Sequence, residues 1–244
     1  MGFLLQTHAD LNVHVLAEAM EGWSLDESLT WAWETFGTQA AIGTSYQGSG
    51  LVIIHHAMQL GLRFPVFTVD TGLLFPETLE LKSRLEEFFG IQIESLTPAQ
   101  TVAEQNESYG GELWKTSPDT CCTLRKVLPL QKKLSQLDVW ITGVRRNQTD
   151  NRAKMKHLEL YEFDKIREHY LLKLNPMLNW SREEVWDYIH QHRIPYNPLH
   201  DRGYRSIGCW TCTKPKGGEN ERAGRWEGFD KTECGIHTFL GQNI

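Results

Sequence analysis

Several segments of the chain have apolar residues every three or four positions, and one is apolar at almost every position. The first pattern is typical of a helix with one face on a core, and the second of a buried helix. Ser24 and Glu27 form a capping-box pattern before one segment, and Ser181 and Glu184 before another. Helices are predicted over residues 11–22, 25–36, 51–60, 76–89 and 124–134 and after Ser181.

Short apolar runs bounded by turn residues lie between these helices, which is typical of buried strands. Alternating strands and helices with short connections favour an α/β fold, a parallel sheet with helices on both faces. The loops at 45–50, 70–75 and 143–153 follow predicted strands, so we expect them to meet at the carboxyl edge of the sheet, where such folds bind ligands. Residues 194–234 show little periodicity, which points to a functional segment. The predicted strands are 39–45, 64–69, 91–95, 138–142 and 170–174.

The composition is ordinary for a soluble globular protein, with 40% hydrophobic and 23% charged residues. The net charge of −6 gives no reason to expect nucleic-acid binding, so an anionic small ligand would need a local cationic site. The sequence has no run of about 18 apolar residues, so no membrane span is expected. Acidic residues and no basic region mark the first thirty positions, which favours a cytoplasmic protein over a secreted one. A homo-oligomer is neither favoured nor excluded.

The segment Ser45-Tyr46-Gln47-Gly48-Ser49-Gly50 lies between a predicted strand and a predicted helix. Glycines let backbone N–H groups turn towards an anion, and a helix N-terminus adds partial positive charge. The segment is neither a Walker A loop nor G-x-G-x-x-G, and an ordinary tight turn explains it equally well. Asp70 and Thr71 end the next strand, where a ribose or base could approach, although Asp70 also suits an ordinary polar loop. The candidate anion ligands are Ser45, Gly48, Ser49 and Gly50.

Five cysteines are arranged as an adjacent pair, Cys121 and Cys122, a C-x-x-C pair, Cys209 and Cys212, and the lone Cys234. An odd number in a chain of this kind argues against a disulfide framework. Two thiolate pairs suit zinc or an iron–sulfur cluster. Adjacent cysteines diverge, which is awkward for a zinc knuckle but suits the separated corners of a cuboidal cluster. The cluster is therefore favoured, with zinc, or free thiols and a reducible disulfide, as alternatives.

Cys234 stands in the run Lys231-Thr232-Glu233-Cys234-Gly235-Ile236-His237 with no other cysteine near it. We expect Lys231 and His237 to lower the pKa of its thiol, and Gly235 to leave its approach open. A lone cysteine near a terminus is usually unremarkable, but this polar setting favours a reactive thiol.

Specific motifs extend from about residue 39 to residue 237. They are Asp70-Thr71-Gly72 with Phe75-Pro76-Glu77-Thr78, Cys121-Cys122-Thr123-Leu124-Arg125-Lys126, Thr142-Gly143-Val144-Arg145-Arg146, Pro195-Tyr196-Asn197-Pro198-Leu199-His200, Gly208-Cys209-Trp210-Thr211-Cys212-Thr213, Glu221-Arg222-Ala223-Gly224-Arg225-Trp226 and Glu233-Cys234-Gly235-Ile236-His237. In combination they resemble the adenylyl-sulfate and phosphoadenylyl-sulfate reductases of sulfate assimilation. One departure is Trp210, where many relatives have proline, although the C-x-x-C spacing is unchanged.

The resemblance implies a modified ATP-pyrophosphatase (adenine nucleotide α-hydrolase-like) fold. It implies a nucleotide-binding domain over residues 1–200, and a segment over residues 201–244 of the same unit that carries cluster ligands and the catalytic residue. The family's nucleophile corresponds to Cys234. Family members with both cysteine pairs bind a [4Fe-4S] cluster and favour adenylyl sulfate, although some accept its 3′-phosphorylated form too. The implied cluster ligands are Cys121, Cys122, Cys209 and Cys212.

The implied reaction begins with attack of the Cys234 thiolate on the sulfur of adenylyl sulfate, which releases AMP. A second thiol then splits the S-sulfonate to give sulfite. The chain ends at Ile244 without a thioredoxin-like domain, so a separate thioredoxin or glutaredoxin is expected to supply the electrons. Lys126 is expected to lie between cluster and substrate. Further candidate contacts for the anionic nucleotide are Arg152, Arg222 and Arg225, then Arg145 and Arg146, with Gly143 beside them.

Three alternatives stay open at this point. The first is the same chemistry on phosphoadenylyl sulfate. The second is an adenylating ATP pyrophosphatase, although the loop at 45–50 lacks the aspartate of the usual S-G-G-x-D-S sequence. The third is a zinc- or cluster-based sensor or scaffold, against which the isolated Cys234 motif argues.

Overall fold

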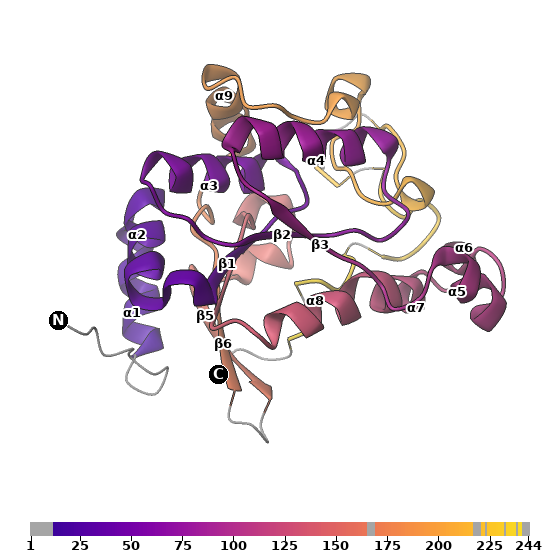
Figure 1. The fold of residues 1–244 in the computed structure, drawn as a ribbon, viewed down its shortest axis with the longest axis horizontal. Helices are drawn as coiled ribbons and strands as arrows, with labels where there is room; N and C mark the ends of the chain where they lie inside the picture. Colours follow the sequence, from indigo (N-terminus) through magenta and orange to yellow (C-terminus); the bar gives the residue numbers. More distant parts are fainter. Residues whose placement is uncertain are drawn as a thin grey trace.

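A six-stranded sheet forms the centre of the described chain, with strand order β3-β2-β1-β4-β6-β5 (Figure 1). The computed structural model describes residues 12–164, 169–216, 221–222, 224–231, 233–237 and 239–240. The strands are β1 (Ala40–Gly43), β2 (Val66–Val69), β3 (Ile93–Leu96), β4 (Val139–Thr142), β5 (Leu158–Asp164) and β6 (His169–Leu174).

The predicted α/β fold is confirmed, and all five predicted strands form close to their expected positions. β3, β2, β1, β4 and β6 run parallel to one another. β5 was not predicted, and it pairs antiparallel with β6 at the edge of the sheet. An edge strand buries less of its surface than a central one, so its apolar run is interrupted by the exposed Glu162; the second glutamate of the strand, Glu159, is buried.

Helices flank the sheet and mostly follow the predicted segments; the first residue predicted for the first helix, residue 11, lies outside the described residues. The structure adds α5, α6 and α7, where the sequence predicted no element. The helices are α1 (Val13–Ala19), α2 (Leu25–Phe36), α3 (Gly48–Gln59), α4 (Pro76–Phe89), α5 (Val102–Tyr109), α6 (Leu113–Thr116), α7 (Pro118–Cys122), α8 (Leu128–Leu134) and α9 (Arg182–Gln191), with a π turn η4 (Thr123–Val127) and 3₁₀ turns η2 (Met20–Gly22), η3 (Gly37–Gln39), η5 (Arg146–Gln148), η6 (Arg152–Lys154), η7 (Pro198–Arg202) and η8 (Trp210–Cys212).

Both predicted capping boxes are confirmed. The Ser24 backbone N–H donates to Glu27 at 2.7 Å, and the Glu27 N–H donates to the serine hydroxyl at 3.2 Å. Ser181 and Glu184 exchange the same bonds at 2.7 and 3.0 Å. These bonds satisfy N–H groups that a helix start otherwise leaves unpaired, which fixes where α2 and α9 begin.

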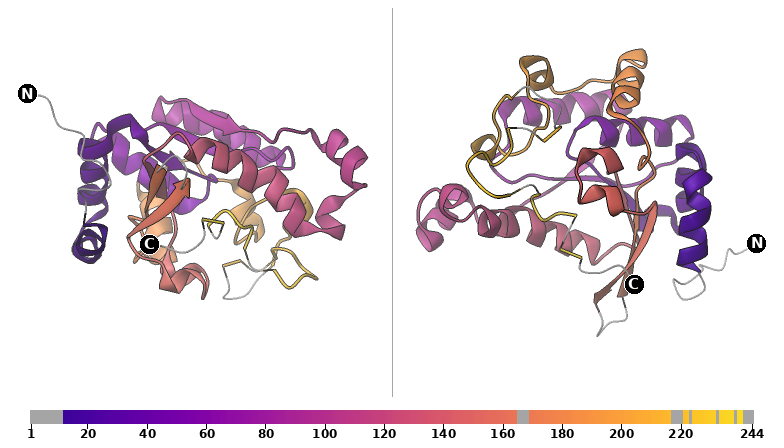
Figure 2. Two further views of the ribbon diagram at one scale, coloured as in Figure 1. Left: turned by 90° about the horizontal axis from the view of Figure 1, so that it is seen from below. Right: turned by 180° about the vertical axis from the view of Figure 1, so that it is seen from behind.

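Helices cover both faces of the sheet, as predicted. On one face, α2, α3, α4 and α9 pack against apolar side chains such as Ile42 and Ile141. On the opposite face, Leu130 and Leu134 of α8 pack against residues that include Phe67. Figures 1 and 2 show α8 on the side of the sheet away from α3 and α4. No helix in the described part of the chain is long and apolar enough to cross a membrane.

The described part of the C-terminal segment lies against the carboxyl edge of the sheet. The Trp210 N–H donates to the Leu73 carbonyl at 2.9 Å, and Cys209 forms an isolated bridge with Leu74. A second bridge joins Thr213 to Arg225 within the segment. These backbone contacts attach an otherwise irregular chain to the loop that follows β2, next to the cavity described below.

Candidate active site

A cavity of about 220 Å³ opens at the carboxyl edge of the sheet. Its walls include the residues that follow β1, β2 and β4 and parts of the C-terminal segment. The predicted convergence of the three loops is therefore confirmed. The candidate residues that line the cavity are Ser45, Gly48, Ser49, Gly50, Thr71, Lys126, Gly143, Arg145, Arg152, Cys209, Arg222, Arg225 and Cys234.

The candidate anion site is formed by the first turn of α3 rather than by a loop, because the helix already begins at Gly48. Backbone N–H groups of a first helical turn have no partner within the helix, and the helix dipole adds partial positive charge there. A Cβ atom on Gly143 would lie 2.9 Å from the Ser49 Cβ and 3.0 Å from the Gly50 nitrogen. Only glycine lets the end of β4 approach the start of α3 this closely.

Of the two candidates after β2, Thr71 lines the cavity and Asp70 does not. Asp70 does not line the cavity, and its carboxylate accepts the Gly72 N–H at 2.9 Å, so it stabilises its own turn. Thr71 lines the cavity, and its hydroxyl lies 3.3 Å from the Cys209 sulfur. Thr71 therefore connects the loop after β2 to the C-x-x-C segment.

Four cysteines come together from α7 and from the C-x-x-C segment around η8. Cys121 and Cys209 belong to one buried apolar cluster, and Cys212 packs against it. Cys122 is buried beside them. Burial raises the pKa of Cys121, and it raises the pKa of Cys122 to about 11.

This donor set fits a metal group, because cysteine thiolates are typical ligands of zinc and of iron–sulfur clusters and all four thiols are free. Within the described residues, no three histidine, cysteine or acidic side chains gather as they would around a single ion.

The Cys234 thiol is half-buried and faces the cavity. Burial raises its pKa, but the cations Lys126 and Arg222 oppose this effect. The Ile236 N–H and Arg225 also lower the pKa of Cys234, which therefore lies below the usual value of a thiol. A lowered pKa increases the fraction of thiolate, the form that attacks an electrophile.

Lys126 is almost completely buried beside the cavity. Burial lowers its pKa, but the neighbouring cysteine sulfurs, led by Cys209 and Cys234, raise it more. Lys126 therefore remains a cation between the four-cysteine cluster and the nucleophile, where the sequence placed it.

The expected local causes of thiol activation are wrong. Lys231 pairs with Asp119 and lies 5.6 Å from the ring centroid of Trp226. Burial and the cations around it, first Arg152, lower the pKa of His237 well below its usual value. His237 is therefore neutral at pH 7 and adds no positive charge beside Cys234.

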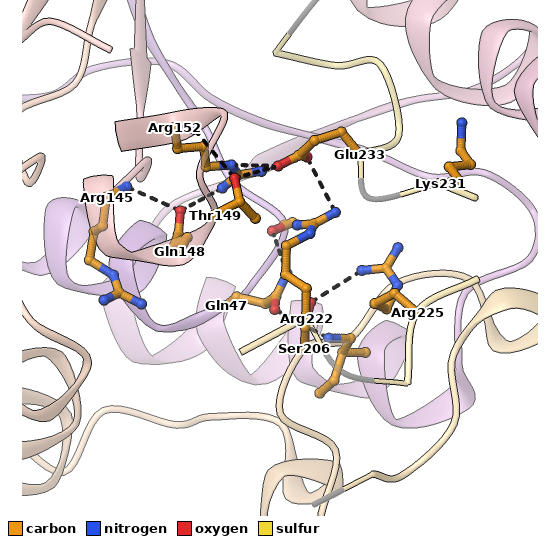
Figure 3. A network of polar contacts seen from close by, with 12 residues as sticks. Gln47, Arg145, Gln148, Thr149, Arg152, Ser206, Arg222, Arg225, Lys231 and Glu233 are labelled. Carbon is orange, nitrogen blue, oxygen red and sulfur yellow. Dashed lines mark hydrogen bonds and ion pairs between the residues drawn. The ribbon is translucent and has the colours of Figure 1, made fainter. Parts of the chain in front are cut away.

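The candidate arginines are held by carboxylates of the C-terminal segment (Figure 3). Arg145 donates two bonds to Glu221, at 2.6 and 2.9 Å, and Arg152 donates two to Glu233, at 2.9 and 3.0 Å. Arg222 lies 3.3 Å from the same Glu233 carboxylate. Figure 3 shows the side chains of Arg152, Arg222 and Glu233 pointing toward one another. Anion-binding groups from two parts of the chain thus meet at one place.

The remaining arginines differ in position. Arg225 donates to the Ser206 hydroxyl at 3.2 Å, and its guanidinium lies 4.4 Å from the ring centroid of Trp226. Arg146 instead pairs with Glu21 at 2.6 Å, away from the cavity. Arg146 therefore forms a structural ion pair at the surface and does not line the cavity.

Sequence reasoning missed several cavity residues, among them Gln148, Trp140 and Ser206. Gln148 accepts the Arg152 guanidinium at 2.5 Å, and its position three residues after Arg145 was its only signal. Trp140 lies inside a buried strand, where an apolar residue normally belongs to the core. No local pattern marks such a residue as part of a site.

Comparison with known proteins agrees with this geometry. Residues 39–215 match the phosphoadenosine phosphosulfate reductase domain, which is more than half of the chain. The chain belongs to the phosphoadenosine phosphosulfate reductase family. The resemblance inferred from the sequence motifs is confirmed.

Two curated relatives cover most of the chain. The adenosine 5′-phosphosulfate reductase of Halalkalibacterium halodurans is 39% identical over 229 residues, which are 93% of this chain and 97% of that protein. The enzyme of the same name from Salinibacter ruber is 44% identical over 212 residues, which are 86% of this chain and 82% of that protein. Family members of this length therefore align almost from end to end with the chain.

Two solved structures share the fold. The phosphoadenylyl-sulfate reductase from Candida auris, in its phosphate complex, has a TM-score of 0.71 and 26% identity, covering 87% of this chain and 100% of that one. FMN adenylyltransferase from Candida glabrata has a TM-score of 0.54 at 11% identity, covering 86% of this chain and 67% of that one. The second likeness concerns the fold alone, and it fits the expected nucleotide-binding α/β architecture.

Proposed function

We propose that this chain reduces adenylyl sulfate to sulfite and AMP, with Cys234 as the nucleophile. The observation that carries the proposal is the setting of Cys234, whose thiol faces the cavity among Lys126, Arg222 and Arg225. Relatives named adenosine 5′-phosphosulfate reductase, at 39% and 44% identity, support the choice of substrate.

The first step is attack of the Cys234 thiolate on the sulfate sulfur of adenylyl sulfate. A sulfur–sulfur bond forms, the sulfur–oxygen bond to the phosphate breaks, and AMP leaves with the electron pair of that bond. Positioning and charge stabilisation contribute most to a transfer of this kind, as in phosphoryl transfer. Lys126 is placed to stabilise the thiolate before the attack.

The second step needs a dithiol, which we propose is a thioredoxin or a glutaredoxin. One of its thiolates attacks the Cys234 sulfur, and sulfite leaves with the electrons of the sulfur–sulfur bond. The second thiol then reduces the resulting mixed disulfide. The sulfate sulfur gains two electrons, and the donor dithiol becomes a disulfide, so the enzyme returns to its starting state.

We assign substrate binding to the first turn of α3 and to the cavity arginines. The N–H groups at Gly48 and Ser49 suit phosphate oxygens, because that helix end carries partial positive charge, while the Gly50 N–H donates to the Gln47 carbonyl at 3.0 Å and Gly50 lines the cavity. The guanidinium groups of Arg152 and Arg222 suit the sulfate, because arginine offers paired donors to flat or tetrahedral anions. Thr71 and Gly143 complete the wall of the cavity between them.

We further propose that a [4Fe-4S] cluster is the cofactor. Cys121, Cys122, Cys209 and Cys212 would hold it, next to Lys126. When bound, the cluster supplies a charged iron–sulfur group whose field acts on the neighbouring cation. Lys126 would then balance the cluster on one side and the nucleophile on the other.

The segment from residue 201 to residue 244 is proposed to act with residues 1–200 as one unit. Cys209 and Cys212 join the cysteines of α7, while Cys234 and Arg222 border the cavity. We place the protein in the cytoplasm, since that compartment keeps the five free cysteines reduced.

The second candidate substrate is phosphoadenylyl sulfate. The family takes its name from that nucleotide, and the Candida auris reductase of it shares the fold. Its 3′-phosphate adds charge next to the ribose and would require a further cationic contact there.

The deciding experiment measures sulfite release by anaerobically purified protein with thioredoxin, comparing both nucleotides at limiting concentration. We expect preference for adenylyl sulfate. Preference for the 3′-phosphorylated form would replace the substrate but keep the role of Cys234. Cys234→Ser should bind substrate and form no S-sulfonate, and continued sulfite production by this variant would refute the assignment.

A further inference from the structure

A lysine and a glutamate are buried together beneath the cavity, and the reaction proposed above uses neither. Lys173 on β6 is fully buried, and its Nζ lies 3.3 Å from a carboxylate oxygen of Glu159 on β5. Removing two charges from water costs free energy unless each finds further partners. The same carboxylate accepts the Asn175 side-chain N–H at 3.0 Å, and Asn175 accepts the Thr142 hydroxyl at 2.5 Å. Thr142 lines the cavity, so this network reaches the site.

The pair is in register with a cavity tryptophan. Glu159 pairs with Lys173 across β5 and β6, and Lys173 pairs with Trp140 across β6 and β4. Paired residues on neighbouring strands project from the same face of a sheet. The Lys173 Nζ lies 5.9 Å from the Trp140 ring centroid, within the range of a cation–π interaction, and 6.0 Å from the ring centroid of Tyr161. The charge of Lys173 therefore acts on the ring that lines the cavity.

Trp140 in turn supports the segment that carries the nucleophile. The His237 ring stacks on the Trp140 indole with a centroid distance of 5.2 Å and an interplanar angle of 9°. His237 follows Cys234 by three residues, and both face the cavity. A Cβ atom on Gly43 would collide with the Trp140 Nε1, so the strand beside the indole leaves little freedom for the ring. A continuous set of contacts runs from Glu159 to the catalytic segment.

The charges around this stack disfavour a protonated His237. The cations that act on it are Arg152 from η6, Arg222 from the C-terminal segment and Lys173 from β6. Burial first, and then these three cations, hold the pKa of His237 well below its usual value. The charged or titratable groups that face Lys173 itself are Glu159 and Tyr161 from β5, Arg152 from η6 and Glu233 from the C-terminal segment.

We propose that Lys173 is a positioning residue of the active site: paired with Glu159, it fixes the indole of Trp140, and its charge adds to those that act on the imidazole of His237 stacked there. The neutral stack holds residues 233–237 against the sheet, so that the Cys234 thiol faces the cavity. As far as the reaction rate is concerned, this inference rests on the proposed function.

The test replaces both charges, with Lys173→Met and Glu159→Gln in one chain. The double variant leaves no buried charge unpaired, whereas Lys173→Met alone would leave the Glu159 carboxylate without its cation. Two quantities are measured: the single-turnover rate of S-sulfonate formation at saturating adenylyl sulfate, and the pKa of His237 from imidazole NMR signals. We expect a rate about tenfold lower, as for a displaced reacting group, and a higher pKa of His237.

The matched control is the double variant Lys133→Met with Glu94→Gln, which removes a surface pair with a separation of 2.6 Å. It should leave both quantities unchanged. A wild-type rate or an unchanged pKa of His237 in the Lys173–Glu159 variant, with its fold intact by thermal unfolding, would overturn the proposal. Failure of the wild-type chain to form S-sulfonate would instead refute the proposed function. The titration of His237 needs no substrate and would still decide the role of Lys173.

Discussion

Glu233 and Arg152 form a two-bond ion pair, from Nε to one carboxylate oxygen at 2.9 Å and from Nη2 to the other at 3.0 Å. Glu233 immediately precedes Cys234, and Arg152 belongs to η6 after β4. The pair is almost buried, with 8% and 10% of the two side chains exposed, so water screens it weakly. It therefore ties the nucleophile's segment to the body of the protein in the absence of nucleotide.

Glu233→Gln should loosen this segment. The amide keeps the size of the side chain but loses the charge that strengthens both bonds. We expect alkylation of Cys234 about tenfold faster, since bonds to charged groups contribute about 1.5–3 kcal/mol each. Mass spectrometry of the Cys234 peptide at alkaline pH measures this without limitation by thiol ionisation. Glu227→Gln, which removes an exposed partner of Lys214, is the control and should react like the wild type.

The same pair predicts a pH dependence. Burial raises the pKa of Glu233, but the bonds from Arg152 outweigh this effect and the net pKa is lowered. A carboxyl with a lowered pKa in the folded state stabilises that state fully above its unfolded pKa of about 4.3. The contribution is lost as pH falls through the folded value. The protection factors of residues 233–237 against hydrogen exchange, corrected for the intrinsic exchange rate at each pH, should fall below about pH 4 in the wild type and stay unchanged in Glu233→Gln.

The sequence predicted the central sheet well because the parallel strands are buried and carry short, nearly continuous apolar runs. β5 was not predicted because two glutamates interrupt its apolar residues: Glu162 is exposed at the edge of the sheet, and Glu159 is buried only because it pairs with Lys173 of the neighbouring strand. The sequence did not predict α5, α6 and α7 because these helices are short. Gly110 and Gly111 lie between α5 and α6. The start of α3 was placed too late, since Gly48-Ser49-Gly50 suits a loop as well as a first helical turn.

Residue identities in the site were readable from the motifs, but their electrostatics were not. The cation that acts most on Cys234 is Lys126, more than a hundred residues away in sequence, whereas the neighbours Lys231 and His237 do not activate it. Tertiary packing decides which charges meet. Glu233 went unremarked for the same reason, since its partner Arg152 lies on another element.

Gly143→Ala should impair the anion site. The added methyl group would lie 2.9 Å from the Ser49 Cβ, so β4 and the first turn of α3 must move apart. Overpacking of this kind costs about 1–3 kcal/mol of folding stability, and the displaced first turn of α3 should lower the affinity for AMP, measured by calorimetry, by about tenfold. Gly111→Ala meets no atom within 4 Å and should bind AMP like the wild type. Equal affinities in the two variants would show that this close approach does not shape the site.

Cys212→Ser should abolish the iron–sulfur cluster. Cys212 packs against the buried cluster that contains Cys121 and Cys209, so loss of its thiolate would leave a corner of the proposed iron–sulfur cluster without a protein ligand. Anaerobically purified wild-type protein should be brown and contain iron and acid-labile sulfide, and the variant should contain neither. Cys234→Ser should keep both, because that thiol belongs to the cavity. Colourless wild-type protein containing zinc would replace the cluster assignment by a zinc site.

Lys126→Met should raise the pKa of the Cys234 thiol. Methionine keeps most of the side-chain volume in this buried position and removes the largest attractive charge on the thiolate. One unit of pKa corresponds to about a tenfold change in the thiolate fraction below the pKa. Alkylation of Cys234 at pH 7 should therefore slow by about tenfold or more and recover at alkaline pH, where the thiol ionises without help. Lys132→Met, on the exposed side of α8, is the control. A variant whose alkylation profile coincides with that of the wild type would assign the activation of Cys234 to Arg222, Arg225 and the Ile236 N–H instead.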